Sequence, residues 1–247
     1  EDIMTIAKHL PKTCQTIMFS ATMPTKIEQL AKTLLKNPVE VKLSVSKPAD
    51  KIKQSAYICY EPQKIEILKS MFKNNDLKRV IIFSGKKQKV KDINRALLQL
   101  KINSGEMHSD LSQDERDKIM FDFKSGRIDV LVATDILSRG IDIDDISIVI
   151  NYDVPHDVED YVHRIGRTAR ADKDGTAITL VNENDFTYFH QIEVFLEKSI
   201  EINALPENIG AGPEYKPNAK KTFKKGYNPK RHRNSTHKNN MNRKKQK

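Results

Sequence analysis

Several short runs of this chain are apolar at every position. Val80–Phe83 reads Val-Ile-Ile-Phe, and Val130–Ala133 reads Val-Leu-Val-Ala. A strand with one face in water alternates apolar and polar side chains, whereas a strand covered on both faces is apolar throughout. These runs therefore predict strands buried inside a parallel sheet, with helices on both of its faces.

Helical patterns lie between the strand-like runs. Apolar residues recur at spacings of three and four around Leu68, Leu97, Phe123 and Phe189, which is the spacing of an amphipathic helix. The runs that favour strands are Thr16–Phe19, Val39–Leu43, Ser55–Tyr60, Val80–Ser84, Asp129–Ala133, Ser147–Asn151 and Thr176–Val181. Alternating strands and helices of this kind predict an α/β fold built on a doubly wound parallel sheet.

Composition divides the chain further. Ser44–Lys53 is polar and contains proline, which is typical of a linker between domains. Lys216–Lys247 holds 13 Lys and Arg and no Asp or Glu, whereas the preceding 215 residues hold 30 basic and 33 acidic side chains. With so few apolar residues, the tail is expected to be disordered when free and to favour polyanions, above all nucleic acid. The predicted boundaries are residues 1–43, a linker at 44–53, a lobe at 54–205 and a basic tail at 206–247.

The chain has two cysteines, Cys14 and Cys59, and no His lies at zinc-ligand spacing from a Cys pair. They cannot form a disulfide framework, which favours reduced thiols in a cytosolic or nuclear compartment, and we expect a cytoplasmic protein. No apolar run reaches the length of a membrane span, and Glu1–Met4 lacks the regions of a secretory signal. The chain begins within an amphipathic stretch instead of at an initiator Met, so we expect it to be cut from a longer protein.

Three segments carry residues suited to phosphate chemistry, and ligands of doubly wound sheets bind beyond the carboxyl ends of the strands. These segments are Phe19–Thr22, Ala133–Ile143 and Tyr161–Arg170. A spacing of three puts Arg164, Arg167 and Arg170 on one side of a helix, as a solvated face also requires. Gly166 and the Thr-Ala pair after Arg167 instead predict a helix that ends in a loop, with guanidinium groups directed at a phosphate.

Together these segments resemble the motifs of the DEAD-box family of superfamily 2 helicases. In the family's order, motifs III, IV, QxxR, V and VI match Ser20–Thr22, Ile81–Gly85, Gln113 with Arg116, Ala133–Asp142 and His163–Arg170. The resemblance covers roughly Thr16 to Leu205. It implies a RecA-like fold, in which residues 54–205 are the second RecA-like lobe and residues 1–43 are the end of a preceding, ATP-binding lobe.

The resemblance also implies a role for each matching residue. ATP would be met by Gly140, Asp142, Arg167 and Arg170. Within that set, Arg167 and Arg170 would be the catalytic arginine fingers at the γ-phosphate, and Asp142 would hold the ribose. The RNA backbone would be met by Ser84, Gly85, Gln113, Arg116 and Thr134. Coupling between the lobes would involve Ser20, Thr22, Asp135, Arg139 and His163. Ala169 stands where many members have Gly, and we expect this change to matter little.

The implied cofactors are ATP and Mg²⁺, with Mg²⁺ held mainly by the first lobe and no metal ligand assigned to this chain. RNA and ATP are the implied partners, and we expect a monomer that joins ribosomal or RNA-decay complexes and no membrane. Contacts to phosphate and 2′-hydroxyl groups carry little base information, so we expect weak sequence selectivity.

Two patterns imitate catalytic motifs. Asp114–Asp117 fits the D-E-x-D pattern that names the family, but no apolar strand precedes it, and Ser112 with Glu115 fits an S-x-x-E capping box. Gly85-Lys86-Lys87 lacks the rest of a phosphate-binding loop. Because the sequence contains neither a Gly-Lys-Ser/Thr loop nor a strand-borne Asp-Glu pair, we expect no ATP hydrolysis by this chain alone.

Alternatives to an ATP-dependent RNA helicase remain at this point. The chain fits a non-catalytic RNA-binding or scaffold module of the same fold, and a DNA helicase of the same superfamily. In the tail, Tyr215, Phe223 and Tyr227 lie among basic residues, a mixture that can stack bases while holding phosphates. A solubilising or nuclear-import segment would have a similar composition.

Overall fold

The computed structural model describes residues 2–11, 13–20, 23, 25–41, 51–73, 76–135, 146–169 and 174–216. Clustering of contacts divides the chain into two units, Glu1–Pro217 and Asn218–Lys247. The elements described below all belong to the first unit. None of the helices in the described ranges has the length and apolar character needed to cross a membrane.

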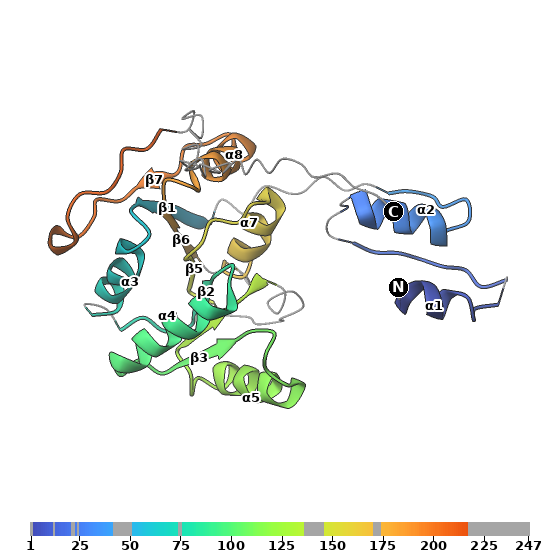
Figure 1. Ribbon diagram of the computed structural model, residues 1–247, viewed down its shortest axis with the longest axis horizontal. Coiled ribbons are helices and arrows are strands. Elements are labelled where there is room, and N and C mark those ends of the chain that lie inside the picture. Colours follow the sequence, from blue (N-terminus) through green and yellow to red (C-terminus); the bar gives the residue numbers. More distant parts are fainter. Residues whose placement is uncertain are drawn as a thin grey trace, which may run out of the picture. The chain divides into compact units, whose positions relative to one another are not determined.

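Seven strands form one sheet in the order β3-β4-β2-β5-β6-β1-β7, and every pair of neighbours is parallel (Figure 1). The strands are β1 Ile52–Ile58, β2 Val80–Phe83, β3 Ser104–Met107, β4 Val130–Ala133, β5 Ile148–Asn151, β6 Gly175–Val181 and β7 Glu201–Ile202. All four residues of β2 and of β4 are buried. The prediction of a parallel sheet with strands buried on both faces is confirmed.

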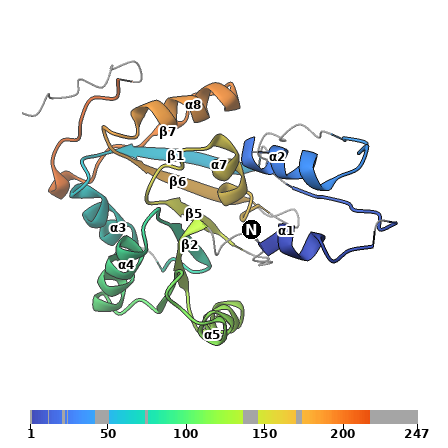
Figure 2. The ribbon, with the colours of Figure 1, turned by 45° about the vertical axis from the view of Figure 1, so that its right-hand side comes forward.

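Helices cover both faces of this sheet, as predicted for a RecA-like doubly wound fold. They are α3 Gln63–Lys73, α4 Lys87–Gln99, α5 Gln113–Lys124, α7 Val158–Ile165 and α8 Phe186–Leu196. On one face, α3 and α4 pack against Val80 and Ile82 of β2. On the other, α5 packs against Ile81 and Phe83, while α7 and α8 cover β1 and β6. Figure 2 shows α3 and α4 on one side of the strands and α7 on the other.

The segment before the sheet contains two helices, α1 Asp2–Ala7 and α2 Thr25–Leu34. The strands predicted at Thr16–Phe19 and Val39–Leu43 are wrong for their described residues, which form no strand. Phe19 is 93% exposed and Val39 is 91% exposed. A strand is held by hydrogen bonds to its neighbours, and neither run has a neighbouring strand within the described part of the chain.

Two strands at the edges of the sheet have no apolar run to reveal them. The sequence of β3 is Ser-Gly-Glu-Met, and β7 has only two residues. Gly105 in β3 makes room for α5 and the segment after it, because a Cβ there would lie 3.2 Å from Ile119 Cγ2 in α5 and 2.9 Å from Ile128 Cδ1. The pattern of apolar residues therefore predicts the central strands and misses the edges.

The boundaries of the lobe differ from the sequence-based ones at both ends. β1 begins at Ile52, within the predicted linker. Residues 206–216, predicted as part of a disordered tail, pack on the lobe: Gln63 Nε2 donates to the carbonyl oxygen of Ile209 at 3.1 Å, and Tyr215 Oη donates to Glu193 Oε2 at 2.7 Å. The Ile209 and Tyr215 side chains are partly buried against the core. Residues 206–216 are therefore part of the folded lobe, contrary to the prediction that assigned them to the tail.

Candidate functional site

The loops that follow β3, β4 and β2 lie side by side at the carboxyl edge of the sheet. The backbone N–H of Ser84 donates to the carbonyl oxygen of Ala133 at 3.0 Å, and that of Thr134 donates to Met107 at 3.1 Å. These bonds connect the residues that follow β2 and β4 to the neighbouring strand ends. The structure therefore brings Ser84, Gly85 and Thr134, which are predicted to contact RNA, to the edge where doubly wound sheets bind their ligands. The loop after β3 leads into α5, whose first turn carries Gln113 and Arg116.

The Ser84–Gly85 turn at the end of β2 is held by Asp153. Ser84 Oγ donates to Asp153 Oδ2 at 2.7 Å, and the Gly85 N–H donates to the same oxygen at 3.0 Å. Ser84 is fully buried, whereas Gly85 is exposed. The hydroxyl of Ser84, predicted to meet RNA, is thus directed into the protein and fixes the shape of the turn.

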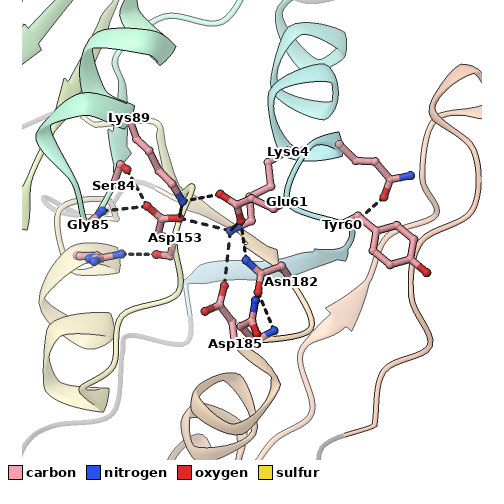
Figure 3. Close-up of polar contacts among 12 residues, drawn as sticks. Tyr60, Glu61, Lys64, Ser84, Gly85, Lys89, Asp153, Asn182 and Asp185 are labelled. Atoms are coloured by element: carbon pink, nitrogen blue, oxygen red, sulfur yellow. Dashed lines mark hydrogen bonds and ion pairs between the residues drawn. The ribbon is translucent and has the colours of Figure 1, made fainter. Parts of the chain in front are cut away.

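Asp153 belongs to a group of polar side chains that we call the Asp153 cluster (Figure 3). Its members are Glu61, Lys64, Lys89, Asp153, Asn182 and Asp185. Lys64 is fully buried, and its Nζ lies 3.1 Å from Glu61 Oε2, 3.4 Å from Asp153 Oδ1 and 3.5 Å from Asp185 Oδ2. A Lys is rarely buried to this degree unless it is paired.

Lys89 connects two acids of the Asp153 cluster. Its Nζ lies 2.5 Å from Glu61 Oε1 and 2.6 Å from Asp153 Oδ1. Burial opposes the ionised form of Asp153, but the charge of Lys64 and hydrogen bonds from Lys89, Ser84 and Gly85 outweigh it and lower its pKa to about 2. Asp153 is therefore a carboxylate at neutral pH, and it accepts hydrogen bonds with both oxygens.

A second buried ion pair joins the segment after β4 to α7. Arg164 Nε donates to Asp135 Oδ1 at 2.5 Å, and Arg164 Nη2 donates to Asp135 Oδ2 at 2.7 Å. Nη1 of the same residue donates to Asn151 Oδ1 at 3.2 Å and to the carbonyl oxygen of Asp153 at 2.8 Å. Arg164 is buried, so a solvated helix face is the wrong interpretation for this arginine. Asp135, predicted to join the two lobes, makes this contact within its own lobe.

The segment that resembles motif VI begins in α7 and continues past its end. The helix ends at Ile165 with Gly166 as its C-cap, which confirms the predicted change from helix to loop. His163 lies in the last turn of α7, and Arg167 follows the C-cap; both are half-buried. Thr168 is buried and its Oγ1 donates to the carbonyl oxygen of Ile146 at 2.5 Å, which anchors the loop directly after Arg167.

Gln113 and Arg116 lie in the first turn of α5. Gln113 is exposed and its Nε2 donates to Asp117 Oδ1 at 2.9 Å. Arg116 Nη2 donates to the carbonyl oxygen of Ser109 at 3.4 Å, while its Nε is buried and has no hydrogen-bond partner among the described residues. A buried donor without a partner is costly, so Arg116 Nε is an unusual feature of this turn of α5.

The predicted capping box at the start of α5 is confirmed. Ser112 Oγ accepts from the Glu115 N–H at 3.3 Å, and the Ser112 N–H donates to Glu115 Oε2 at 2.8 Å. Because the Glu115 side chain caps the helix, the Asp114-Glu115 pair is not arranged as the metal-binding pair of a D-E-x-D motif. The Ser112 N–H and Ser112 Oγ both donate to the Glu115 carboxylate, at 2.8 Å each, and these two bonds lower the pKa of Glu115.

Part of the predicted site lies outside the described residues, namely Thr22, Arg139, Gly140, Asp142 and Arg170. Ser20 is described, in an exposed segment without regular structure. The sequence analysis did not identify the Asp153 cluster. Part of its signal was available, because Asn182 directly follows a predicted strand and Asp153 comes two residues after another, which is the criterion that selected the other loops.

Known proteins are similar to this chain over most of its length. The family described as "Helicase conserved C-terminal domain" matches residues 63–172. ATP-dependent RNA helicase CshA of Limosilactobacillus reuteri is 37% identical over 194 residues, which cover 78% of this chain and 39% of that protein. ATP-dependent RNA helicase FAL1 of Saccharomyces cerevisiae is 36% identical over 211 residues, which cover 85% of this chain and 52% of that protein. The chain thus spans about half or less of the length of these relatives.

Solved structures agree with the sequence relatives. S. cerevisiae Dbp5 bound to RNA and ADP BeF3 matches with a TM-score of 0.72 and 32% identity, over 81% of this chain and 54% of that chain. E. coli DEAD-box protein SrmB, bound to regulator of ribonuclease activity A, matches with a TM-score of 0.60 and 33% identity, over 66% of this chain and 98% of that chain. With Ser84, Gly85 and Thr134 directly after β2 and β4 at the carboxyl edge of a RecA-like sheet, these matches show that the chain belongs to the DEAD-box RNA helicase family and contains its C-terminal helicase domain.

Proposed function

We propose that this chain is the C-terminal part of an ATP-dependent RNA helicase that unwinds or remodels RNA as it hydrolyses ATP. The observation that carries the proposal is the placement of Gly85 and Thr134 directly after β2 and β4, with Gln113 and Arg116 in the first turn of α5, which follows β3. Arg116 Nε is buried and has no hydrogen-bond partner among the described residues. Contacts from adjacent strand ends suit a continuous sugar-phosphate backbone. The names of the relatives, and the RNA and ADP BeF3 bound to Dbp5, support the same assignment.

On the nucleotide side, the proposed groups are Gly140, Asp142, Arg167 and Arg170. Arg167 lies in the loop after α7, between the buried ion pair of Arg164 and the anchored Thr168. An arginine whose neighbours in the chain are anchored on both sides suits the γ-phosphate of ATP, where an arginine finger contributes roughly 10³–10⁵ in rate. Mg²⁺, held mainly by the first lobe, would neutralise phosphate charge.

Supplying the arginine fingers from a second lobe makes hydrolysis depend on closure of the two lobes. RNA that contacts both lobes would favour the closed state, so RNA binding and ATP turnover would be coupled. The Arg164–Asp135 pair supports this coupling, because it joins the segment that meets RNA through Thr134 to the segment that carries Arg167. Ser20, Thr22, Arg139 and His163 remain proposed members of the coupling path.

The proposed setting is a reducing cytoplasmic compartment, with a monomer that joins ribosomal or RNA-decay complexes. Both cysteines are free, Cys14 exposed and Cys59 buried. Burial raises the pKa of the Cys59 thiol to about 11, so it is protonated and unreactive at neutral pH.

RNA-stimulated ATP hydrolysis tests the proposal. The 247-residue chain alone should show none, whereas the same chain joined to a DEAD-box first lobe should hydrolyse ATP in response to RNA. In the joined protein, Arg167→Ala should lower turnover by at least about 10³, while Arg127→Ala in the exposed segment after α5 should leave it unchanged. Turnover by the chain alone, or a joined protein indifferent to Arg167, would refute the assignment.

A further inference from the structure

The carboxylate of Asp153 serves two groups of partners at once. Oδ2 accepts hydrogen bonds from Ser84 Oγ and from the Gly85 N–H, at 2.7 and 3.0 Å. Oδ1 faces the two ammonium groups of Lys89 and Lys64, at 2.6 and 3.4 Å. One side chain thus connects the turn after β2 to charges from α3 and α4 (Figure 3).

The lysines have little freedom to leave Asp153. Lys64 is fully buried and is also paired with Glu61 and Asp185, and Lys89 is paired with Glu61. Moving Asp153 away would leave a buried ammonium group with less compensating charge, which is costly in a low-dielectric interior. The Asp153 cluster therefore holds the carboxylate in a defined place.

The donors of the turn point inward. Because Ser84 Oγ and the Gly85 N–H are both bonded to Asp153, an RNA strand at this turn meets the exposed backbone of Gly85 and the exposed side chain of Lys86. The groups that the turn presents to RNA therefore depend on the conformation of the turn, and that conformation is held by the Asp153 carboxylate.

We propose that Asp153 is a positioning residue for RNA binding: it holds the Ser84–Gly85 turn in the shape that meets the RNA backbone. The inference rests on the proposed function, which assigns this turn to the RNA contact. It adds to that function a residue outside the motifs, together with the lysines that hold it in place.

Three variants separate positioning from simple stabilisation. Asp153→Asn removes the charge and presents an amide N–H₂ to groups that are donors. Ser84→Ala removes one of the two bonds from the turn while leaving every charge of the Asp153 cluster in place. Asp185→Asn is the matched control, because it removes the same charge beside Lys64, at 3.5 Å, from an acid that has no contact with the turn in the described residues.

The measurements are made by NMR on the full 247-residue chain, with a uridine oligonucleotide as the probe. Amide resonances of Gly85 and Lys86 report on the turn itself, so binding by the basic tail does not mask the result. Hydrogen exchange of the Gly85 amide, without RNA, reports on its bond to Asp153.

In the unmodified chain and in Asp185→Asn, the Gly85 amide should be protected, and RNA should shift both resonances with apparent Kd values within about twofold of each other. In Asp153→Asn, protection should be lost and the apparent Kd at these resonances should rise by at least about tenfold, as expected when a hydrogen-bonded charge is removed. Ser84→Ala should give an intermediate loss, and it keeps the test valid where Asp153→Asn does not fold.

The outcomes distinguish two failures. If RNA does not shift these resonances in the unmodified chain, the RNA contact itself is refuted, and the inference with it. If RNA shifts these resonances, and both Asp153→Asn and Ser84→Ala bind RNA with the affinity of the unmodified chain, the RNA contact stands and the positioning role is overturned. Equal loss of RNA affinity in Asp153→Asn and Asp185→Asn would also overturn it, because the effect would then be one of general stability.

Discussion

Arg164 reaches both carboxylate oxygens of Asp135, with Nε 2.5 Å from Oδ1 and Nη2 2.7 Å from Oδ2. Arg164 comes from α7 and Asp135 follows β4, so the pair joins the segments that resemble motifs VI and V. The planar guanidinium fits a carboxylate in this two-bond geometry, which a Lys cannot reproduce. The relative placement of the two segments therefore depends on one buried ion pair.

Loss of this pair should be strongly destabilising. Arg164 is 4% exposed, and removing one partner of a buried pair costs about 3–5 kcal/mol. Arg164→Ala should lower the free energy of unfolding by that amount in urea denaturation. Arg127→Ala is the control: Arg127 pairs with Asp122 at 3.2 Å but is 68% exposed, so its loss should cost less than about 1 kcal/mol. Equal losses would contradict the structural role of Arg164.

The parts of the fold that are encoded locally could be predicted from the sequence. The apolar runs of β2 and β4 are contiguous, and the capping box lies within four residues of the chain. The strand ends that carry Asp153 and Asn182 could be predicted, but the pairing of Asp153 with Lys64 could not, because the two residues are 89 positions apart. A Lys in a helix looks like a solvated side chain until the fold buries it between acids from other strand ends.

Apolar content also led to wrong strand predictions where the described part of the fold supplies no neighbouring strand. Phe19 and Val39 occur in runs that resemble buried strands, yet both are exposed. Conversely, β3 is a strand because β4 pairs with it along its length, from Ser104 opposite Val130 to Met107 opposite Ala133. Whether these segments form strands depends on the presence of a pairing partner, and the residues of a single run do not reveal that partner.

Gly175 at the start of β6 is predicted to tolerate no side chain. A Cβ there would lie 2.4 Å from Thr168 Oγ1 and 2.7 Å from the Ala169 backbone nitrogen. Gly175→Ala should therefore push the loop after Arg167 out of place and cost about 1–3 kcal/mol, the usual range for overpacking. Gly85→Ala is the matched control, because among the described residues its Cβ would meet only Asp153 Oδ2, at an ordinary 3.9 Å. Thermal denaturation of both variants checks this, and a Gly175→Ala variant as stable as Gly85→Ala would contradict it.

Asp153 should make the protein sensitive to acid. Burial opposes its charge, but Lys64, Lys89, Ser84 and Gly85 lower its pKa from 3.8 to about 2. Because the folded-state pKa is depressed, the stability it contributes is present above pH 3.8 and is lost as the pH falls towards 2. That contribution is about 2 kcal/mol. The difference in unfolding free energy between the unmodified chain and Asp153→Asn should shrink across this range; a difference that is constant between pH 5 and 2 would contradict the assignment.

The helix cap before α5 should have a measurable but smaller effect. Ser112→Ala removes the hydroxyl that accepts from the Glu115 N–H, and loss of such a cap costs about 0.5–2 kcal/mol. Ser125→Ala at the other end of the helix removes a bond from Oγ to the Asp122 carbonyl oxygen at an exposed position, and should change stability by less than about 0.5 kcal/mol. Urea denaturation distinguishes the two, and equal values would show that the capping box does not stabilise α5.

The basic tail should dominate the salt dependence of RNA binding. Lys216–Lys247 contributes 13 positive side chains and no acid to a chain with net charge +10, so without it the remaining residues are slightly acidic overall. Each phosphate neutralised on a single strand contributes about −0.7 to the slope of log K against log salt. Deleting this segment should flatten the slope, measured by fluorescence anisotropy with a single-stranded RNA, while the RNA-dependent shifts at Gly85 persist. A slope that stays the same after the deletion would exclude the tail as an RNA anchor and favour a solubilising or import role for it.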